Sequence, residues 1–266
     1  MLQILLTNDD GYHAAGLKAL IEALIEALSG IARITVVAPA KNKSACGHSL
    51  TLDRPLRMIC MKDDFYKIDD ATPTDCVYLS LGNLFKEGYK PDLVVSGINI
   101  GANMGEDITY SGTASAAMEA VIQGIPAIAI SQVCRNMSQG IDDGMDFDLA
   151  KENIVKLVKK IINGSFPLDE RKFLNVNIPA IKADECKGFK ITKAGYRKYG
   201  NDSHRHLNPR GEEYYWIGLH PLIWVPSEDK SCDFEAISDG YVSITPIKLD
   251  MTSYKDIENL ENWLAD

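Results

Sequence analysis

The hydrophobic positions of the N-terminal segment change period twice within the first 40 residues. An apolar run, Leu2 to Leu6, is followed at once by the polar sequence TNDDG at residues 7–11. Hydrophobic residues then recur at helical spacing until Ser29-Gly30, at Leu17, Leu20, Ile21, Leu24, Ile25 and Leu28. A second β-rich run covers Ile34 to Val37. This order predicts a β-α-β unit, which requires a right-handed crossover and a parallel sheet.

The same alternation continues along the chain. Buried strands are predicted at 93–95, 127–130 and 173–178, and helices at 72–85, 111–120 and 147–162. After residue 180 the pattern changes to β-rich pieces separated by long polar stretches. We therefore predict a single α/β domain, with a Rossmann-like, three-layer parallel sheet over residues 1–180 and a β-rich C-terminal arm over residues 181–266.

Composition narrows the function classes. The 266 residues are 45% hydrophobic and 24% charged, as in a soluble globular protein, and carry a net charge of -9. This charge argues against a surface that binds nucleic-acid duplexes. No apolar run approaches the roughly 18 residues of a membrane span, so we expect a cytoplasmic protein with no membrane partner. The six cysteines form no C-x-x-C motif and are expected to be reduced, without a zinc site.

The acidic turn is the first candidate for chemistry. Neighbouring strand side chains point to opposite faces, so Asp9 and Asp10 converge only where the strand breaks into a turn, which Gly11 supplies. Two carboxylates about 4 Å apart repel by roughly 4 kcal/mol at an effective dielectric near 20, which favours a shared proton or a hard divalent cation. A solvent-facing Asp-Gly turn is the alternative.

A small, polar and basic loop, residues 38–51, follows the second predicted strand. It lies at the same edge of the sheet as the acidic turn, where open α/β sheets bind ligands. Ser44 and Ser49 offer hydroxyl oxygens to a metal ion, and His48 is either a general acid or a packing residue. A solvated loop without a ligand is the alternative.

A glycine-rich stretch, residues 96–105, follows the strand at 93–95 and indicates a backbone bent around a neighbour. The chain then reaches SGTASAAMEA at residues 111–120, where small hydroxylated residues give way to strong helix formers. The free N–H groups of a helix start, together with the hydroxyls of Ser111 and Thr113, suit a phosphate. A helix cap with no ligand is the alternative.

These segments together resemble the survival protein E (SurE) family of metal-dependent 5′-nucleotidases. The matching blocks are TNDDG (7–11), KSACGHSLT (43–51), TPTDCV (72–77), SGINIGANMGEDITYSGTASAAMEA (96–120), GIPAIAIS (124–131), NPRGEEYYWIG (208–218) and DGYVSITPI (239–247). The resemblance therefore spans nearly the full length of the chain.

The resemblance implies a phosphomonoesterase that hydrolyses nucleoside 5′-monophosphates, with 3′-nucleotides and short polyphosphate as further substrates. The resemblance also implies one divalent cation per subunit, Mg²⁺ or Mn²⁺, with Asp9, Asp10, Ser44 and Asn99 as its ligands. We expect Asp9 also to orient or deprotonate the attacking water. The phosphate-binding residues are expected to be Asn8, Asn103, Ser111, Gly112 and Thr113.

The chain departs from the family pattern at Ala40, Ala71 and Ile100, and the loss of a basic residue at Ile100 leaves the substrate preference open. Two other classes compete with a nucleotidase. A phosphoacceptor signalling domain also places an acidic pair after its first strand, but it needs a further Asp where this chain has Asn99. A non-catalytic nucleotide sensor would share the pocket and differ only in turnover.

The C-terminal arm suggests an oligomer. The segment between the strands predicted at 189–192 and 214–217 is too long for an ordinary hairpin loop, so we expect it to extend from the body. Its aromatic residues would expose apolar surface unless a second subunit covered them. The resemblance also implies a homodimer or homotetramer with exchanged C-terminal segments.

Overall fold

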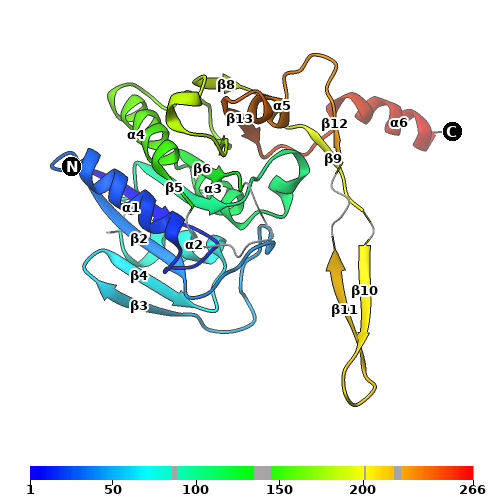
Figure 1. Ribbon diagram of the computed structural model, residues 1–266, viewed down its shortest axis with the longest axis horizontal. Helices are drawn as coiled ribbons and strands as arrows, with labels where there is room; N and C mark the ends of the chain where they lie inside the picture. Colours follow the sequence, from blue (N-terminus) through cyan, green and yellow to red (C-terminus); the bar gives the residue numbers. More distant parts are fainter. Residues whose placement is uncertain (86–88, 135–144, 201, 219–222, 266) are drawn as a thin grey trace.

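The computed structural model describes residues 1–85, 89–134, 145–200, 202–218 and 223–265. Its main sheet runs in the order β3-β4-β2-β1-β5-β6-β7-β13-β8 (Figure 1). The strands are β1 (Leu2–Thr7), β2 (Ala32–Pro39), β3 (Arg57–Lys62), β4 (Phe65–Asp69), β5 (Leu93–Ile100), β6 (Ala127–Gln132), β7 (Lys172–Ile178), β8 (Phe189–Ile191) and β13 (Val242–Lys248). All pairs from β4 across to β7 are parallel, which confirms the predicted parallel sheet.

Helices cover both faces of this sheet: α1 (Ala15–Ala27) and α4 (Asp148–Asn163) on one, α2 (Pro73–Asn83) and α3 (Gly112–Ile122) on the other. Strand β1 shows why the arrangement has three layers. Ile4 and Leu6 pack in the cluster that contains α1 and α4, whereas Leu5 packs in the cluster that contains α2 and α3. A strand buried on both faces needs a continuous apolar run. Truncating such a side chain to Ala costs about 2–5 kcal/mol of stability.

Helix α2 begins as its sequence predicts. The Thr72 hydroxyl accepts from the Asp75 N–H at 3.1 Å, and the Asp75 carboxylate accepts from the Thr72 N–H at 2.8 Å. Asp75 also accepts from the N–H and hydroxyl of Thr51, at 2.8 and 2.7 Å. This capping box therefore fixes the end of the loop that follows β2 as well as the helix start.

The chain after residue 180 divides between the main sheet and a projecting arm. Strands β8 and β13 lie beyond β7 in the main sheet, so the sheet draws on both sides of the predicted boundary at residue 180. The arm contains the β9-β12 ladder and the β10-β11 hairpin, which projects from the body (Figure 1). Its strands are β9 (Tyr196–Lys198), β10 (Asp202–Leu207), β11 (Glu213–Gly218) and β12 (Ile223–Val225).

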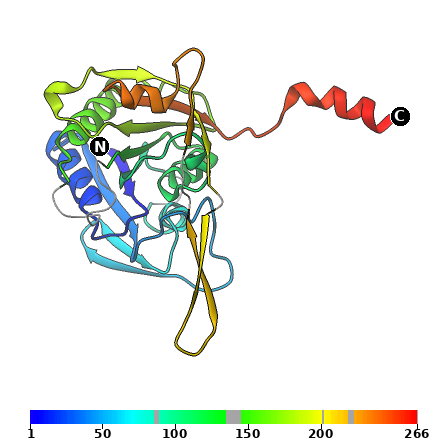
Figure 2. The same cartoon turned by 45° about the vertical axis from the view of Figure 1, so that its right-hand side comes forward.

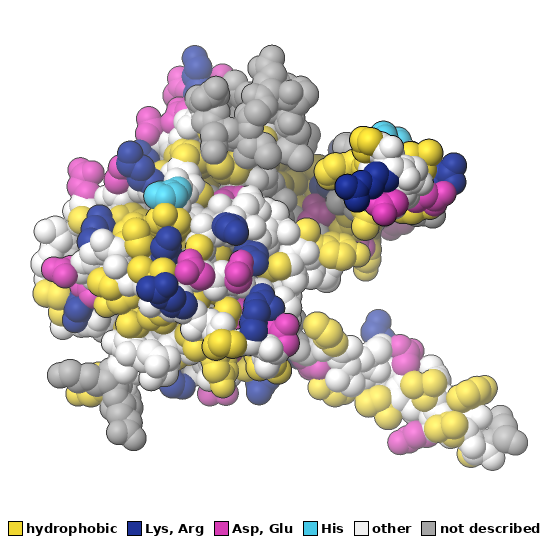
Figure 3. Space-filling view, turned by 90° about the horizontal axis from the view of Figure 1, so that it is seen from below, with side chains coloured by type: hydrophobic (Ala, Val, Ile, Leu, Met, Phe, Trp, Pro, Cys, Tyr) yellow, Lys and Arg dark blue, Asp and Glu magenta, His cyan; other side chains and the backbone are white. Residues whose placement is uncertain are grey.

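The remaining elements are short: η1 (Gly105–Thr109), η2 (Ala183–Glu185), α5 (Asp233–Ser238), η3 (Tyr254–Asp256) and α6 (Ile257–Ala265). Helix α6 extends away from the body (Figure 2). Figure 3 shows hydrophobic side chains on both projecting segments; they include Trp216 and Ile217 on the hairpin and Trp263 and Leu264 on α6. Within the described ranges, no helix has the length and apolar character needed to cross a membrane.

Candidate active site

The predicted site residues emerge from the carboxyl ends of neighbouring strands. Leu6 of β1 pairs with Val36 of β2 on one side and with Val95 of β5 on the other. The loops that follow these three strands therefore start side by side. Gly11 turns the first loop with a φ of 103°, and a Cβ there would lie 3.2 Å from the Lys41 carbonyl carbon. Only glycine combines this backbone angle with so close an approach.

Asp9 points into the protein toward the start of helix α3. Its side chain is buried, and its carboxylate accepts a hydrogen bond from the Thr113 hydroxyl. Burial raises the pKa of Asp9, while the Thr113 hydroxyl and the backbone N–H groups of Thr113 and Gly112 partly oppose the shift. A Cβ on Gly112 would lie 2.7 Å from the Asp9 Cβ. Glycine at residue 112 therefore lets the helix begin directly against Asp9.

Asp10 has different surroundings from Asp9. One of its carboxylate oxygens accepts from the Ile100 backbone N–H at 3.1 Å, and the other from the Asn42 side chain at 3.4 Å. The two adjacent carboxylates therefore have different partners: Asp9 contacts Thr113 of α3, and Asp10 contacts Ile100 and Asn42. Because the Ile100 contact uses the main chain, the absence of a basic side chain there does not disturb it.

The other two predicted metal ligands lie on either side of β1: Asn99 near the carboxyl end of β5, and Ser44 in the loop after β2. Asn99 is buried, and its amide nitrogen donates to the Gly101 carbonyl at 2.8 Å, which leaves Oδ1 as its ligand atom. Ser44 is exposed in the loop after β2. The N–H of its neighbour Lys43 donates to the Asp9 carbonyl at 2.7 Å, so this loop is tied to the acidic turn.

The donor chemistry fits a hard divalent cation. The four predicted ligands offer two carboxylates, an amide oxygen and a hydroxyl at one edge of the sheet, and such oxygen donors suit Mg²⁺ or Mn²⁺. The buried Asn8 Oδ1 has no hydrogen-bond partner among the described residues, although its amide nitrogen donates to the Gly11 carbonyl at 2.9 Å. A water bound to a cation would satisfy this acceptor. The described residues hold no cluster of three His, Cys, Asp or Glu side chains, so neutral oxygens must complete the ligand set.

The predicted phosphate residues already have partners within the protein. The Ser111 hydroxyl accepts from the Ala114 N–H at 3.0 Å and caps α3, and the Thr113 hydroxyl is bonded to Asp9. The Asn103 side chain donates to the Ser131 hydroxyl at 2.7 Å. The cap that the sequence offers as an alternative is therefore present. Ser111 still has its own hydroxyl hydrogen to donate to a ligand.

Sequence reasoning missed the residues that hold Asn103 in place. Its carbonyl accepts from the side chains of Asn175 and Asn177 at 2.8 and 3.0 Å, and its N–H donates to the Asn177 side chain at 2.9 Å. Asn175 and Asn177 are fully buried in β7. Buried side-chain amides at alternate positions of a strand must find hydrogen-bond partners. The Asn-x-Asn pattern in β7 was therefore the sequence signal that a polar segment packs against this strand.

A second missed group fixes the base of the arm to η1, which precedes Ser111. Arg197 lies 3.2 Å from the Asp107 carboxylate, to which the Tyr199 hydroxyl donates at 2.5 Å. Burial raises the pKa of Asp107, and its bonds to Tyr199 and Arg197 partly oppose that shift. Burial and the Asp107 carboxylate both raise the pKa of Tyr199. The base of the arm is therefore joined by an ion pair and a hydrogen bond to η1, which leads into α3.

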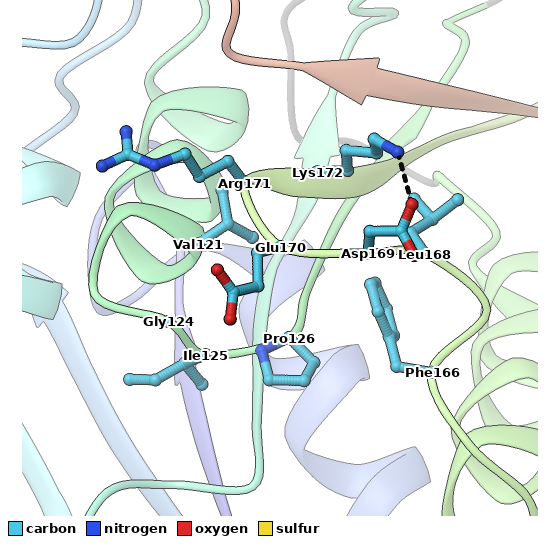
Figure 4. Close-up of a pocket in the computed structure, with 10 residues that line it drawn as sticks. All are labelled: Val121, Gly124, Ile125, Pro126, Phe166, Leu168, Asp169, Glu170, Arg171 and Lys172. Atoms are coloured by element: carbon cyan, nitrogen blue, oxygen red, sulfur yellow. Dashed lines mark hydrogen bonds and ion pairs between the residues drawn. The ribbon is translucent and has the colours of Figure 1, made fainter.

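A separate cavity of about 130 Å³ lies at the amino ends of β6 and β7 (Figure 4). Its floor is apolar, and the ion pair between Asp169 and Lys172 lies at its rim. None of the predicted site residues lines it. Because it occupies the opposite edge of the sheet, we exclude it as the candidate active site.

Comparison with known proteins shows which family the chain is similar to. Residues 4–201 match the family model described as "Survival protein SurE". The chain is 77% identical over 264 residues to 5′-nucleotidase SurE of Aliarcobacter butzleri (strain RM4018), covering 99% of each chain. It is 61% identical to 5′-nucleotidase SurE of Sulfurovum sp. (strain NBC37-1), covering 98% of this chain and 97% of that one.

A solved structure of the SurE protein from Aquifex aeolicus has the same fold. It matches with a TM-score of 0.81 and 44% sequence identity, covering 99% of this chain and 100% of the other. Family model, relatives and solved structure agree over nearly the full length, so this chain belongs to the SurE family.

Proposed function

We propose that this chain is a 5′-nucleotidase that hydrolyses nucleoside 5′-monophosphates to nucleoside and phosphate with one divalent cation per subunit. The observation that carries the proposal is that hydrogen bonds tie the acidic turn to both neighbouring segments: Asp10 accepts from the N–H of Ile100, next to Asn99, and the Asp9 carbonyl accepts from the N–H of Lys43, next to Ser44. The names of the close relatives support the same activity.

We assign cation binding and water positioning to two overlapping sets of residues. Asp9, Asp10, Ser44 and Asn99 would hold Mg²⁺ or Mn²⁺, which, when bound, polarises a phosphoryl oxygen and lowers the pKa of a bound water. Asp9 orients the attacking water, and the Thr113 hydroxyl fixes the rotation of its carboxylate. This arrangement keeps the reacting groups positioned before the substrate arrives.

Phosphate capture falls to the start of α3 and its neighbours. The Ser111 hydroxyl donates to a phosphate oxygen while the helix start with Gly112 and Thr113 supplies positive potential. Asn8 and Asn103 complete the phosphate site. Groups that recognise phosphate alone would also accept 3′-nucleotides and short polyphosphate, which we propose as secondary substrates.

The alternatives fit the site less well. A phosphoacceptor domain needs a further Asp at the position where this chain has Asn99, near the carboxyl end of β5. A nucleotide sensor would bind without turnover. The test is hydrolysis of a panel of nucleoside monophosphates with Mg²⁺, with Mn²⁺ and with chelator. We expect phosphate release only with a cation; binding without release would favour the sensor.

We also propose that the chain forms a homodimer or homotetramer through its C-terminal arm. Trp216 is 66% exposed and Ile217 is 85% exposed on the projecting hairpin, and Trp263 is 71% exposed on α6. Apolar surface of this kind on two projecting segments is typical of an interface.

A further inference from the structure

Glu119 is a charged side chain on the buried face of helix α3. The residue is only 4% exposed, and a buried carboxylate is costly unless it is paired. One of its oxygens lies 3.1 Å from His48 Nε2, and the other accepts from the Gln123 side chain at 2.9 Å. Burial by itself would raise the pKa of Glu119, but the bonds from His48 and Gln123 outweigh it and lower the pKa overall. The carboxylate is therefore held ionised.

His48 belongs to the same loop as Ser44. The main chain ties this loop at Lys43, whose N–H donates to Asp9, and at Gly47, whose N–H donates to the Tyr110 carbonyl at 3.0 Å. His48 adds a side-chain contact that reaches across to α3. Ser44 itself is exposed, so its position depends on how firmly the rest of the loop is held.

Helix α3 thus contacts both sides of the candidate site. Thr113 bonds to Asp9, and Glu119, six residues later and about 9 Å further along the axis, bonds to His48. Because a buried helix moves as a unit, it sets Asp9 and the Ser44 loop relative to each other.

We propose that Glu119 and His48 are positioning residues that hold Ser44 in place for the cation. This inference rests on the proposed function, because it requires Ser44 to be a ligand. Neither residue needs to contact the cation or the substrate. Partners that orient metal ligands in this way typically change metal affinity 10- to 100-fold when they are removed.

The competing explanation is that His48 only neutralises a buried acid. In that case, removing His48 would lower the thermal stability of the protein but leave the affinity of the folded protein for a cation unchanged. Direct measurement of Mn²⁺ binding without substrate, by calorimetry on the full-length protein, separates the two explanations.

The decisive variants are His48→Leu, which removes the donor, and His48→Gln, whose amide nitrogen takes the place of Nε2. His204→Leu is the matched control, because His204 makes a comparable 3.0 Å contact with Asp202 on the arm. We expect the Kd for Mn²⁺ to rise at least tenfold in His48→Leu. In His48→Gln the Kd should return most of the way to the wild-type value, and in His204→Leu it should equal the wild-type value. Glu119→Gln combined with His48→Leu should lose no more affinity than His48→Leu alone.

Wild-type affinity in a folded His48→Leu protein would overturn the inference and leave the proposed function intact. Failure of the wild-type protein to bind Mn²⁺ would overturn the proposed cation site and the inference with it. Thermal unfolding in chelator shows whether each variant is folded. If His48→Leu does not fold, His48→Ser takes its place, since it removes the reach to Glu119 but keeps the loop polar.

Discussion

The hydroxyl of Thr113 donates a hydrogen bond to the buried carboxylate of Asp9, a residue 104 positions earlier in the chain. This contact joins the acidic turn after β1 to the start of α3. A carboxylate at a helix start is stabilised by the free N–H groups there. The groups proposed to hold the cation and those proposed to bind phosphate are therefore parts of one hydrogen-bonded unit.

The first prediction concerns Asp10. Asp10→Asn keeps the shape of the side chain but removes one negative charge from the oxygen donors, so Mn²⁺ affinity and phosphate release should both fall sharply. Glu152→Gln, on the exposed face of α4, is the control and should change neither. Unchanged hydrolysis by Asp10→Asn, or full wild-type activity in chelator, would contradict a cation-dependent mechanism.

The second prediction tests how closely α3 approaches Asp9. In Gly112→Ala the new methyl group would meet the Asp9 Cβ at 2.7 Å and one carboxylate oxygen at 3.0 Å, so either the helix or Asp9 must move. We expect a loss of about 1–3 kcal/mol in the free energy of unfolding, together with weaker Mn²⁺ binding.

Gly82→Ala provides the matched control for that change. Gly82 lies in α2, and a Cβ there has no neighbour within 4 Å. This variant should gain up to about 1 kcal/mol, since Ala favours a helix over Gly. Urea unfolding in chelator gives both values. Equal stability of the two variants would mean that Asp9 and α3 adjust freely to each other.

The third prediction separates capping from phosphate binding at Ser111. Ser111→Ala removes the cap on α3 and should cost about 1 kcal/mol of stability. It should also weaken competitive inhibition by inorganic phosphate and lower turnover by roughly 10²-fold, because a donor to the phosphate is lost. Mn²⁺ affinity should persist. Ser80→Ala, which removes a buried serine hydroxyl bonded to a main-chain carbonyl in α2, should leave phosphate inhibition unchanged.

The fourth prediction concerns assembly. Replacing Trp216 and Ile217 by Ser removes exposed apolar surface from β11 without shortening the hairpin, so sedimentation should shift toward the monomer. The paired substitution Leu52→Ser with Met61→Ser, at exposed sites on the body, should leave the mass unchanged. A wild-type protein that sediments as a monomer at micromolar concentration would by itself contradict the proposed oligomer.

The sequence by itself determined the alternation of strands and helices, the capped start of α2 and the edge of the sheet where the candidate residues gather. These features follow from local patterns. Hydrophobic period selects helix or strand, Thr72 and Asp75 supply a cap within four residues, and parallel topology brings the carboxyl ends of β1, β2 and β5 together.

Only the tertiary structure decided the partner of each polar group. The sequence offered Ser111 and Thr113 equally as caps or as phosphate ligands, and the fold directs Thr113 to Asp9. It also pairs His48 with Glu119 and packs Asn103 against Asn177 of β7. A hydrogen bond requires atoms to approach within about 3 Å. When the partners lie 70 or more residues apart in the chain, that distance depends on how helices and strands pack, and no local pattern contains it.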